Sequence, residues 1–140
     1  MKLKKLSILL ALFVLIVSSL ACSAVTGGES TLSNVRTAKD ENGDQTTSVF
    51  ATTDTIYVVG DISNGKQGNV ISSKWMVSSV KGYDAGYVID SVDLTLDKDQ
   101  SSYSVNFYFA PPTDGWPAGS YKVEVSYNGV LNSTVEYTVK

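Results

Sequence analysis

The sequence predicts an all-β domain, a sandwich or barrel of about seven or eight short strands. Two observations carry this prediction. After residue 34, apolar and polar residues alternate over several segments, and no segment has the 3.6-residue apolar period of a helix. Clusters rich in Gly, Asn and Asp separate these segments at near-even spacing, as turns between strands do.

The first half of the domain holds three expected strands, at 34–39, 55–62 and 70–77. The turn-forming cluster DENGD follows the first, which is weakly patterned. The second alternates clearly, so that Val58 and Tyr57 point to opposite faces. The polar loop SNGKQGN leads into the third, which carries Trp75.

The second half holds four further segments that are expected to form strands, at 87–96, 102–109, 121–127 and 131–139. The first of them counts as one strand or as two. In the next, alternation places Phe107 on one face and Tyr108 on the other. Asn128 and Gly129 separate the last two segments and predict a two-residue hairpin turn.

The first 22 residues have the layout of a secretory signal peptide. A head with three lysines precedes an apolar run at 6–17, small residues follow, and then comes Cys22. The apolar run is shorter than the roughly 20 residues that a membrane span needs. We therefore expect residues 1–21 to be a cleaved signal peptide, and an uncleaved membrane anchor is the alternative.

The segment SLAC at 19–22 resembles the lipobox of bacterial lipoproteins. In that motif the cysteine receives a diacylglyceryl group and cleavage takes place just before it. Ala21 fits the motif, whereas Ser19 and Leu20 are less common at their positions. Lipidation also accounts for a single cysteine in an exported chain, for which a free thiol is the alternative. The resemblance implies attachment to the cell membrane or outer membrane through acyl chains on Cys22, facing away from the cytoplasm.

Residues 22–33 are small and polar, and we expect them to form a flexible tether about 20 Å long before a domain at 34–140. The chain has 11 basic and 14 acidic residues, and three of the lysines lie in the signal peptide. Removing that peptide leaves 8 basic and 14 acidic residues, a net charge of −6. An acidic domain repels phosphate backbones, so nucleic acid is not an expected partner.

The stretch TDGWPAGSYKVEV, at 113–125, carries a resemblance to a known fold. Gly119, Tyr121 and Val123 follow the Gly-x-Tyr-x-Cys pattern of immunoglobulin-like sandwiches, with valine in place of cysteine. Trp75 resembles the core tryptophan of these domains, and Val58 stands where the other cysteine usually lies. The resemblance implies a two-sheet antiparallel sandwich with these four residues, Val58, Trp75, Tyr121 and Val123, in its core and no disulfide. A fibronectin type III-like topology stays open.

The composition excludes several kinds of chemistry. The chain has no histidine, which removes Ser-His-Asp and Cys-His catalysis and histidine-bound metals. With Cys22 assigned to lipidation, thiolate metal sites are excluded as well. Acidic clusters at 40–44 and 97–101 have the spacing that begins a calcium loop, but neither supplies the last ligand. We interpret them as turns, with a weak shared calcium site as the alternative, and expect no catalytic residue, metal or cofactor.

Aromatic residues are the candidate binding residues. Tyr57 and Tyr108 fall on the outward faces of strands that are neighbours in an immunoglobulin-like topology, and such a pair also stabilises a sheet without a ligand. Tyr83 and Tyr87 lie in the loop KGYDAGY, which has the composition of a binding loop but can equally fold over the end of the sandwich. Trp116 is expected to cover one end of the core.

Three functional hypotheses follow. The first is a non-enzymatic binding or accessory domain of the cell envelope, with an envelope protein or a glycan as its partner. The second is a protease inhibitor that inserts the proline-rich corner at 111–119. An enzyme that uses a pair of carboxylates comes third, because the sequence does not show which carboxylates would pair.

Overall fold

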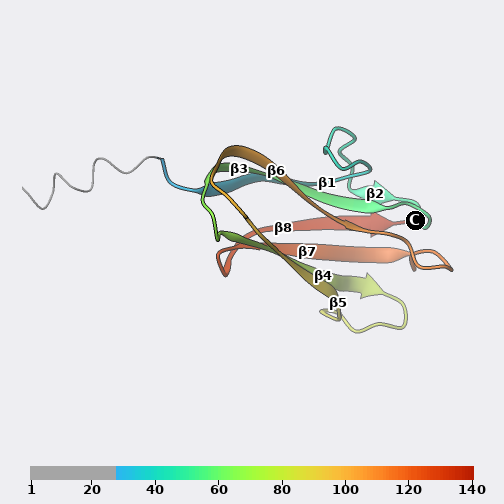
Figure 1. The fold of residues 1–140 in the computed structure, drawn as a ribbon. Coiled ribbons are helices and arrows are strands. Elements are labelled where there is room, and N and C mark those ends of the chain that lie inside the picture. Colours follow the sequence, from blue (N-terminus) through green and yellow to red (C-terminus); the bar gives the residue numbers. More distant parts are fainter. Residues whose placement is uncertain (1–27) are drawn as a thin grey trace, which may run out of the picture.

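A computed structural model describes residues 28–140, so the predicted signal peptide and Cys22 lie outside the described residues. Within this part of the chain, two β-sheets pack face to face (Figure 1). The strands are β1 (Thr31–Ala38), β2 (Val49–Phe50), β3 (Ile56–Gly65), β4 (Val70–Val80), β5 (Val88–Thr95), β6 (Gln100–Phe109), β7 (Gly119–Tyr127) and β8 (Val130–Val139). No helix among the described residues is long and apolar enough to cross a membrane.

The two sheets confirm the predicted all-β, two-layer fold. One sheet has the strand order β1-β3-β6 and the other has the order β2-β8-β7-β4-β5. Neighbouring strands are antiparallel except for β2 and β8, which run parallel. This parallel pair joins Phe50 to Val139, and the buried Phe50 ring packs against Tyr137 in the core.

The strands differ from the sequence-based prediction in two respects. The first strand begins at Thr31, so residues 31–33 belong to the sheet and not to the tether. Leu32 is buried in the core there, and the strand then bulges between Ser33 and Arg36 around Asn34, whose φ is 52°. This bulge breaks the alternation that would have marked the strand. The segment 87–96 holds one strand, β5, and not two. The count of eight is reached because the short strand β2 lies at a place where the sequence predicted none.

The core between the sheets is centred on Trp75 of β4, which is 1% exposed. Its ring lies 5.6 Å from that of Phe109 and 6.3 Å from that of Tyr137, and its indole N–H donates to Ser73 Oγ at 3.2 Å. Val58 and Val123 are buried in the same cluster, from opposite sheets. Trp75 and two valines, one from each sheet, are therefore core residues, as the resemblance to immunoglobulin-like domains implied.

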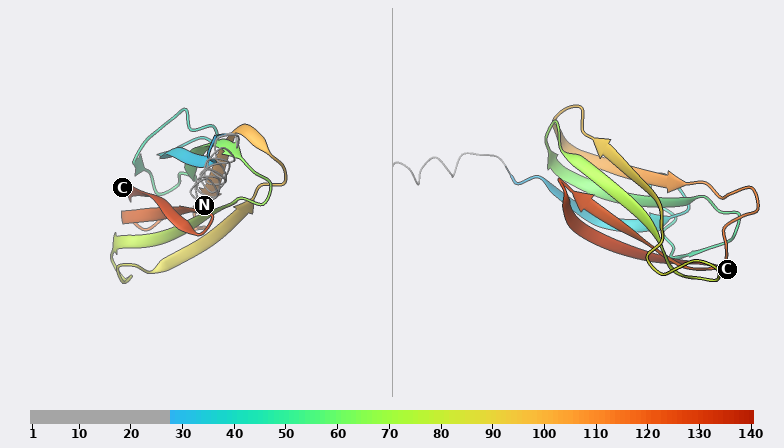
Figure 2. Two further views of the ribbon diagram at one scale, coloured as in Figure 1. Left: turned by 90° about the vertical axis from the view of Figure 1, so that its left-hand side faces the viewer. Right: turned by 90° about the horizontal axis from the view of Figure 1, so that it is seen from below.

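The sandwich has two distinct ends (Figures 1 and 2). The chain enters β1 at one of them, which we call the entry end and which also holds the connections 66–69, 96–99 and 128–129. The opposite, distal end holds the connections 39–48, 51–55, 81–87 and 110–118 together with the C-terminus. Loops at the distal end are thus a full strand length away from residue 28.

Side-chain hydrogen bonds fasten the chain at the entry end. Ser30 Oγ donates to Asn69 Oδ1 at 3.0 Å, and the Tyr127 hydroxyl donates to the same oxygen at 2.8 Å. The Ser30 and Tyr127 hydroxyls also lie within hydrogen-bonding distance of each other, so their two protons are shared among these three oxygens. Because Tyr127 ends β7, this group of three residues ties the segment before β1 to the five-stranded sheet.

Substitution of Trp75 by alanine tests the core. Trp75→Ala removes a fully buried ring, and we expect it to lower the free energy of unfolding by about 3–5 kcal/mol. Urea unfolding followed by circular dichroism measures this change. Val130→Ala is the control, because Val130 is 70% exposed and its removal should change stability by less than about 0.5 kcal/mol. Equal effects of the two substitutions would contradict the assigned core.

Candidate functional site

The corner at 110–118 is held down by the tyrosine that follows it. The Tyr121 hydroxyl donates to the Pro117 carbonyl oxygen at 2.6 Å, the fold-back that the Gly-x-Tyr pattern predicted. Gly119 lies between them with φ of 150°, and a Cβ there would lie 2.5 Å from the Ser79 carbonyl oxygen, so only glycine fits. Burial, and secondarily Tyr83, raises the pKa of Tyr121, so its hydroxyl remains a hydrogen-bond donor.

Trp116, one of the candidate binding residues, is almost fully buried. Its side chain is only 4% exposed, and its indole N–H donates to the Asp54 carbonyl oxygen at 3.0 Å. Its ring lies 5.3 Å from Phe109 and 6.0 Å from Tyr121. Trp116 therefore covers the distal end of the core, as expected, and is not a free aromatic surface.

The loop 81–87 presents two tyrosines at the distal end. Three backbone hydrogen bonds shape this loop. Tyr83 N–H donates to the Val80 carbonyl at 3.1 Å, and Tyr87 N–H donates to the Asp84 carbonyl at 3.1 Å. Gly86 N–H donates to the Val77 carbonyl at 2.8 Å. The rings of Tyr83 and Tyr87 lie 5.6 Å apart, and their side chains are 48% and 53% exposed. The loop thus holds two neighbouring rings that are half packed and half open to solvent.

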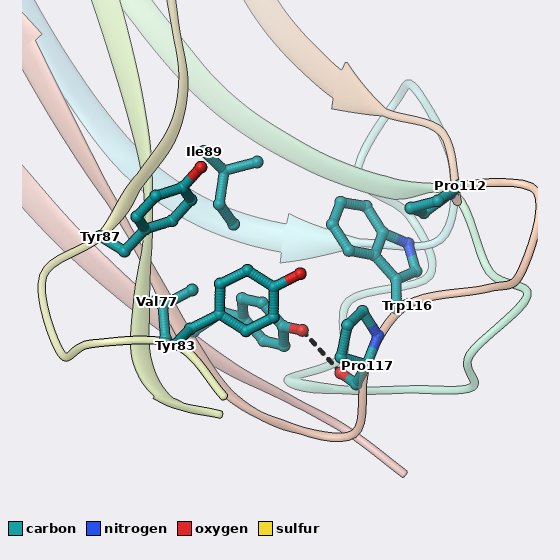
Figure 3. Close-up of a pocket in the computed structure, with 8 residues that line it drawn as sticks. Val77, Tyr83, Tyr87, Ile89, Pro112, Trp116 and Pro117 are labelled. Carbon is teal, nitrogen blue, oxygen red and sulfur yellow. Dashed lines mark hydrogen bonds between the residues drawn. The ribbon is translucent and has the colours of Figure 1, made fainter. Parts of the chain in front are cut away.

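The loop and the corner together form an aromatic cleft, which we call the distal cleft (Figure 3). Its volume is about 210 Å³, and its lining residues are Val77, Tyr83, Tyr87, Ile89, Pro112, Trp116, Pro117 and Tyr121. None of these side chains carries a charge at neutral pH. Sites for drug-sized ligands usually span about 300–1,000 Å³. The distal cleft is therefore sized for one ring-sized apolar group of a larger ligand.

Tyr57 and Tyr108 form a separate pair. They lie directly opposite each other in the register of β3 and β6, with ring centroids 5.9 Å apart, and Tyr108 is 65% exposed. These strands belong to the three-stranded sheet, whereas Val77 and Ile89 of the distal cleft come from β4 and β5 of the other sheet. The four candidate tyrosines therefore form two pairs and not one site.

Both acidic clusters hold the backbone of connections in place, Asp40 within its own connection and Asp99 across to the neighbouring connection 66–69. The Asp40 carboxylate accepts the backbone N–H groups of Gln45 and Asp44 at 2.6 and 3.0 Å, and these bonds lower the pKa of Asp40. The Asp99 carboxylate accepts the N–H of Gln67 at 2.9 Å and lies 3.6 Å from Lys66 Nζ, and both contacts lower its pKa. Among the described residues, no group of three or more acidic, cysteine or histidine side chains could hold a metal ion.

Carboxylate pairs are also missing from the linings of four clefts among the described residues. The distal cleft has no carboxylate among its lining residues. Three further clefts each have a single one, from Glu136, Asp99 and Asp93 respectively. None of these four clefts therefore supplies the two carboxylates that the third hypothesis needs.

Several residues of the distal cleft escaped the sequence analysis. Ile89 and Val77 read as ordinary strand residues, and Ile89 reaches the cleft where the pairing of β4 with β5 shifts register, beside Trp75 and Met76. Pro112 and Pro117 lie in the proline-rich corner that the sequence analysis assigned to the inhibitor hypothesis. The available signal was the combination of glycine and aromatic residues in both GYDAGY and GWPAG, but only the folded chain shows that these segments meet.

Comparisons with known proteins bear on the fold. No protein-family model and no curated protein matches the sequence. An immunoglobulin-like protein from Pseudomonas aeruginosa matches 81% of this chain and 98% of its own, with 15% identity and a TM-score of 0.51. The fold of this chain is therefore immunoglobulin-like, as predicted.

Parts of two larger enzymes are also similar in structure to this chain. An alkylpurine DNA glycosylase from Pseudomonas fluorescens matches 81% of this chain and 31% of its own, with 16% identity and a TM-score of 0.49. A beta-glucosidase from Listeria innocua matches 79% of this chain and 16% of its own, with 12% identity and a TM-score of 0.48. The chain thus spans about a third and about a sixth of the length of these two proteins.

Substitution of Tyr121 by phenylalanine tests the fold-back of the corner. Tyr121→Phe removes one buried hydrogen bond and leaves the Pro117 carbonyl without this donor, so the free energy of unfolding should fall by about 1–3 kcal/mol. Chemical denaturation measures the loss. Tyr108→Phe is the matched control, because Tyr108 is exposed and should tolerate the change. A Tyr121→Phe protein as stable as this control would mean that the corner is held by other contacts.

Proposed function

We propose that this chain is an exported lipoprotein whose immunoglobulin-like domain binds a protein or glycan of the cell envelope without enzymatic activity. The observation that carries the proposal is the distal cleft, an uncharged aromatic cleft with two half-exposed tyrosines. Tyrosine and tryptophan are the side chains that give large, rigid contact areas in binding surfaces.

The position of the cleft supports this role. Cys22 lies only a few residues before residue 28, where the described chain begins near the entry end. Acyl chains on Cys22 would hold that end toward the bilayer. Since β3 has 10 residues, the distal cleft would then stand roughly 30 Å farther out. A ligand in the envelope could reach it without obstruction by the membrane.

The rigidity of the cleft also favours binding. Loop 81–87 is braced by three backbone hydrogen bonds, and the corner is braced by Tyr121 and by the bond from Trp116 N–H to the Thr52 carbonyl at 2.8 Å. A site that is already ordered loses little conformational entropy when a ligand binds. The two walls are therefore suited to recognition of a small group.

The protease-inhibitor hypothesis receives less support. An inhibitory loop has to present extended backbone to the protease, whereas the corner turns back at the bond from Gly115 N–H to the Pro112 carbonyl and buries Trp116. Few residues of the corner are left to enter a protease cleft. A binding domain accounts for both the corner and the tyrosine loop, and we prefer it for that reason.

The anchor is tested by Cys22→Ala in an intact bacterium. The unmodified chain should sediment with membranes, enter the detergent phase of a Triton X-114 partition and carry an acyl mass on its N-terminal peptide. Cys22→Ala should lose the acyl mass while the folded domain remains. If the unmodified chain carries no acyl mass and still contains residues 1–21, the hydrophobic segment at 6–17 is an uncleaved anchor instead.

The binding role of the cleft is tested by photo-crosslinking in the cell. A photoreactive amino acid in place of Tyr87 should capture one dominant partner, because position 87 lines the distal cleft. The same residue in place of Val130, exposed at the entry end, should not capture it. Dominant capture from Tyr57 or Tyr108 instead would move the binding site to the three-stranded sheet and refute the role of the cleft.

A further inference from the structure

We propose that the distal cleft receives a proline residue from an extended segment of the partner protein, with basic residues flanking that proline. This inference rests on the proposed function and adds the chemical class of the ligand. Three properties of the cleft lead to it: its size, its hydrogen-bonding groups and the charges beside it.

The size and walls of the cleft suit a proline ring. About 210 Å³ between tyrosine rings, Trp116 and two prolines accommodates one compact apolar ring. Proline-rich segments adopt the extended polyproline II conformation before they bind, and aromatic-lined grooves recognise them in other proteins. Such a ligand loses little conformational entropy when it binds, and a small contact area can compensate for only a small loss.

The hydrogen-bonding groups of the cleft favour a ligand residue without an N–H. The backbone carbonyls of Val77, Tyr87 and Pro112 already accept bonds from Gly86, Val77 and Gly115. The Pro117 carbonyl accepts the Tyr121 hydroxyl, which is the only hydrogen bond drawn among the eight lining residues in Figure 3.

The lining side chains with free hydrogen-bonding capacity in Figure 3 are two tyrosines, whose hydroxyls can each donate one hydrogen bond and accept another. The hydroxyls of Tyr83 and Tyr87 make no hydrogen bond to another lining residue in Figure 3, and both side chains are about half exposed. They can donate to the carbonyl oxygens beside a proline. Every other residue type would also bring a backbone N–H that needs an acceptor when it loses water, whereas proline brings none.

The number of hydrogen-bond donors on a ligand, set against the acceptors of the cleft, also disfavours a sugar ring. A sugar presents several hydroxyl donors, and each of them requires an acceptor when it is buried. None of the eight lining residues is an aspartate, glutamate, asparagine or glutamine. Stacking on tyrosine would therefore leave most of these hydroxyls without a partner in the cleft.

Acidic residues in the two connections that form the cleft favour basic residues beside the proline. Asp84 lies between the two tyrosines in loop 81–87, and Asp114 lies between Pro112 and Trp116 in the corner. Lys81 is the one basic residue in these two connections. Residues 28–140 as a whole hold 14 acidic and 8 basic residues. Lysine or arginine next to the proline would be attracted here, and added salt would weaken that attraction.

The test is a titration of the full chain in detergent micelles with fluorescein-labelled peptides of eight residues. The peptides carry one, two or three prolines between two terminal lysines. Matched peptides have alanine in place of every proline, or glutamate in place of both lysines. At least one proline–lysine peptide should bind saturably, and its alanine and glutamate counterparts should bind at least about tenfold more weakly, which corresponds to about 1.4 kcal/mol.

Variants locate the binding to the cleft. Tyr87→Ala should weaken the best peptide about tenfold or more. Tyr108→Ala, which removes a somewhat more exposed tyrosine from the other sheet, should leave the binding unchanged. Asp114→Asn should weaken the lysine-flanked peptide and reduce its salt dependence. Circular dichroism and urea unfolding of each variant establish that the fold is intact.

The remaining outcomes separate this inference from the proposed function. Binding of no peptide, or equal binding to the Tyr87→Ala chain, overturns the proline ligand, as does binding of chitotetraose in the cleft. If position 87 still captures a partner in the cell, the binding domain stands and only the ligand class is wrong. If neither peptides nor crosslinked partners are found, both proposals fail.

Discussion

The hydrogen bond from the Tyr121 hydroxyl to the Pro117 carbonyl connects the core of this sandwich to its distal surface. It bends the corner back over β7, and the bend places Trp116 on the end of the core, where its indole N–H reaches the Asp54 carbonyl. Trp116 then packs between Phe109 and Tyr121. One wall of the distal cleft is therefore an extension of the core packing, whereas the other wall, loop 81–87, depends mainly on its own backbone bonds.

This arrangement explains how a small domain can hold an apolar cleft at its surface. A tryptophan in a free loop would stay mobile, but here two carbonyls of connection 51–55, from Thr52 and Asp54, satisfy both of its N–H groups. Asp54 is in turn held by Lys39 Nζ at 2.9 Å and by the Ala51 N–H. Trp116 is thus buried and fully hydrogen-bonded through its N–H groups, and it forms an ordered wall of the cleft that also contains the exposed tyrosines.

Sequence reasoning reached the parts of this structure that depend on local pattern. Alternation correctly placed Tyr57 and Tyr108 on one face, and the Gly-x-Tyr pattern correctly located the fold-back of Tyr121. It could not reach features that depend on contacts between distant segments. The two residues of β2 are strand only because β8 lies beside them, Asn34 marks a bulge inside β1, and the cleft exists because loop 81–87 meets the corner.

The hydrogen-bonded group of Ser30, Asn69 and Tyr127 and the distal cleft lie at opposite ends of the sandwich, which has a mechanical consequence. Ser30, Asn69 and Tyr127 fasten the entering chain to one sheet, and β1 joins it to the other. A pull between the entering chain and a molecule held in the cleft would run along the strands. Backbone hydrogen bonds lie across the strands, so such a tension shears many of them at once and does not unzip them one by one. If the chain is anchored and binds its ligand as proposed, the direction of its strands would let the domain bear load along its length.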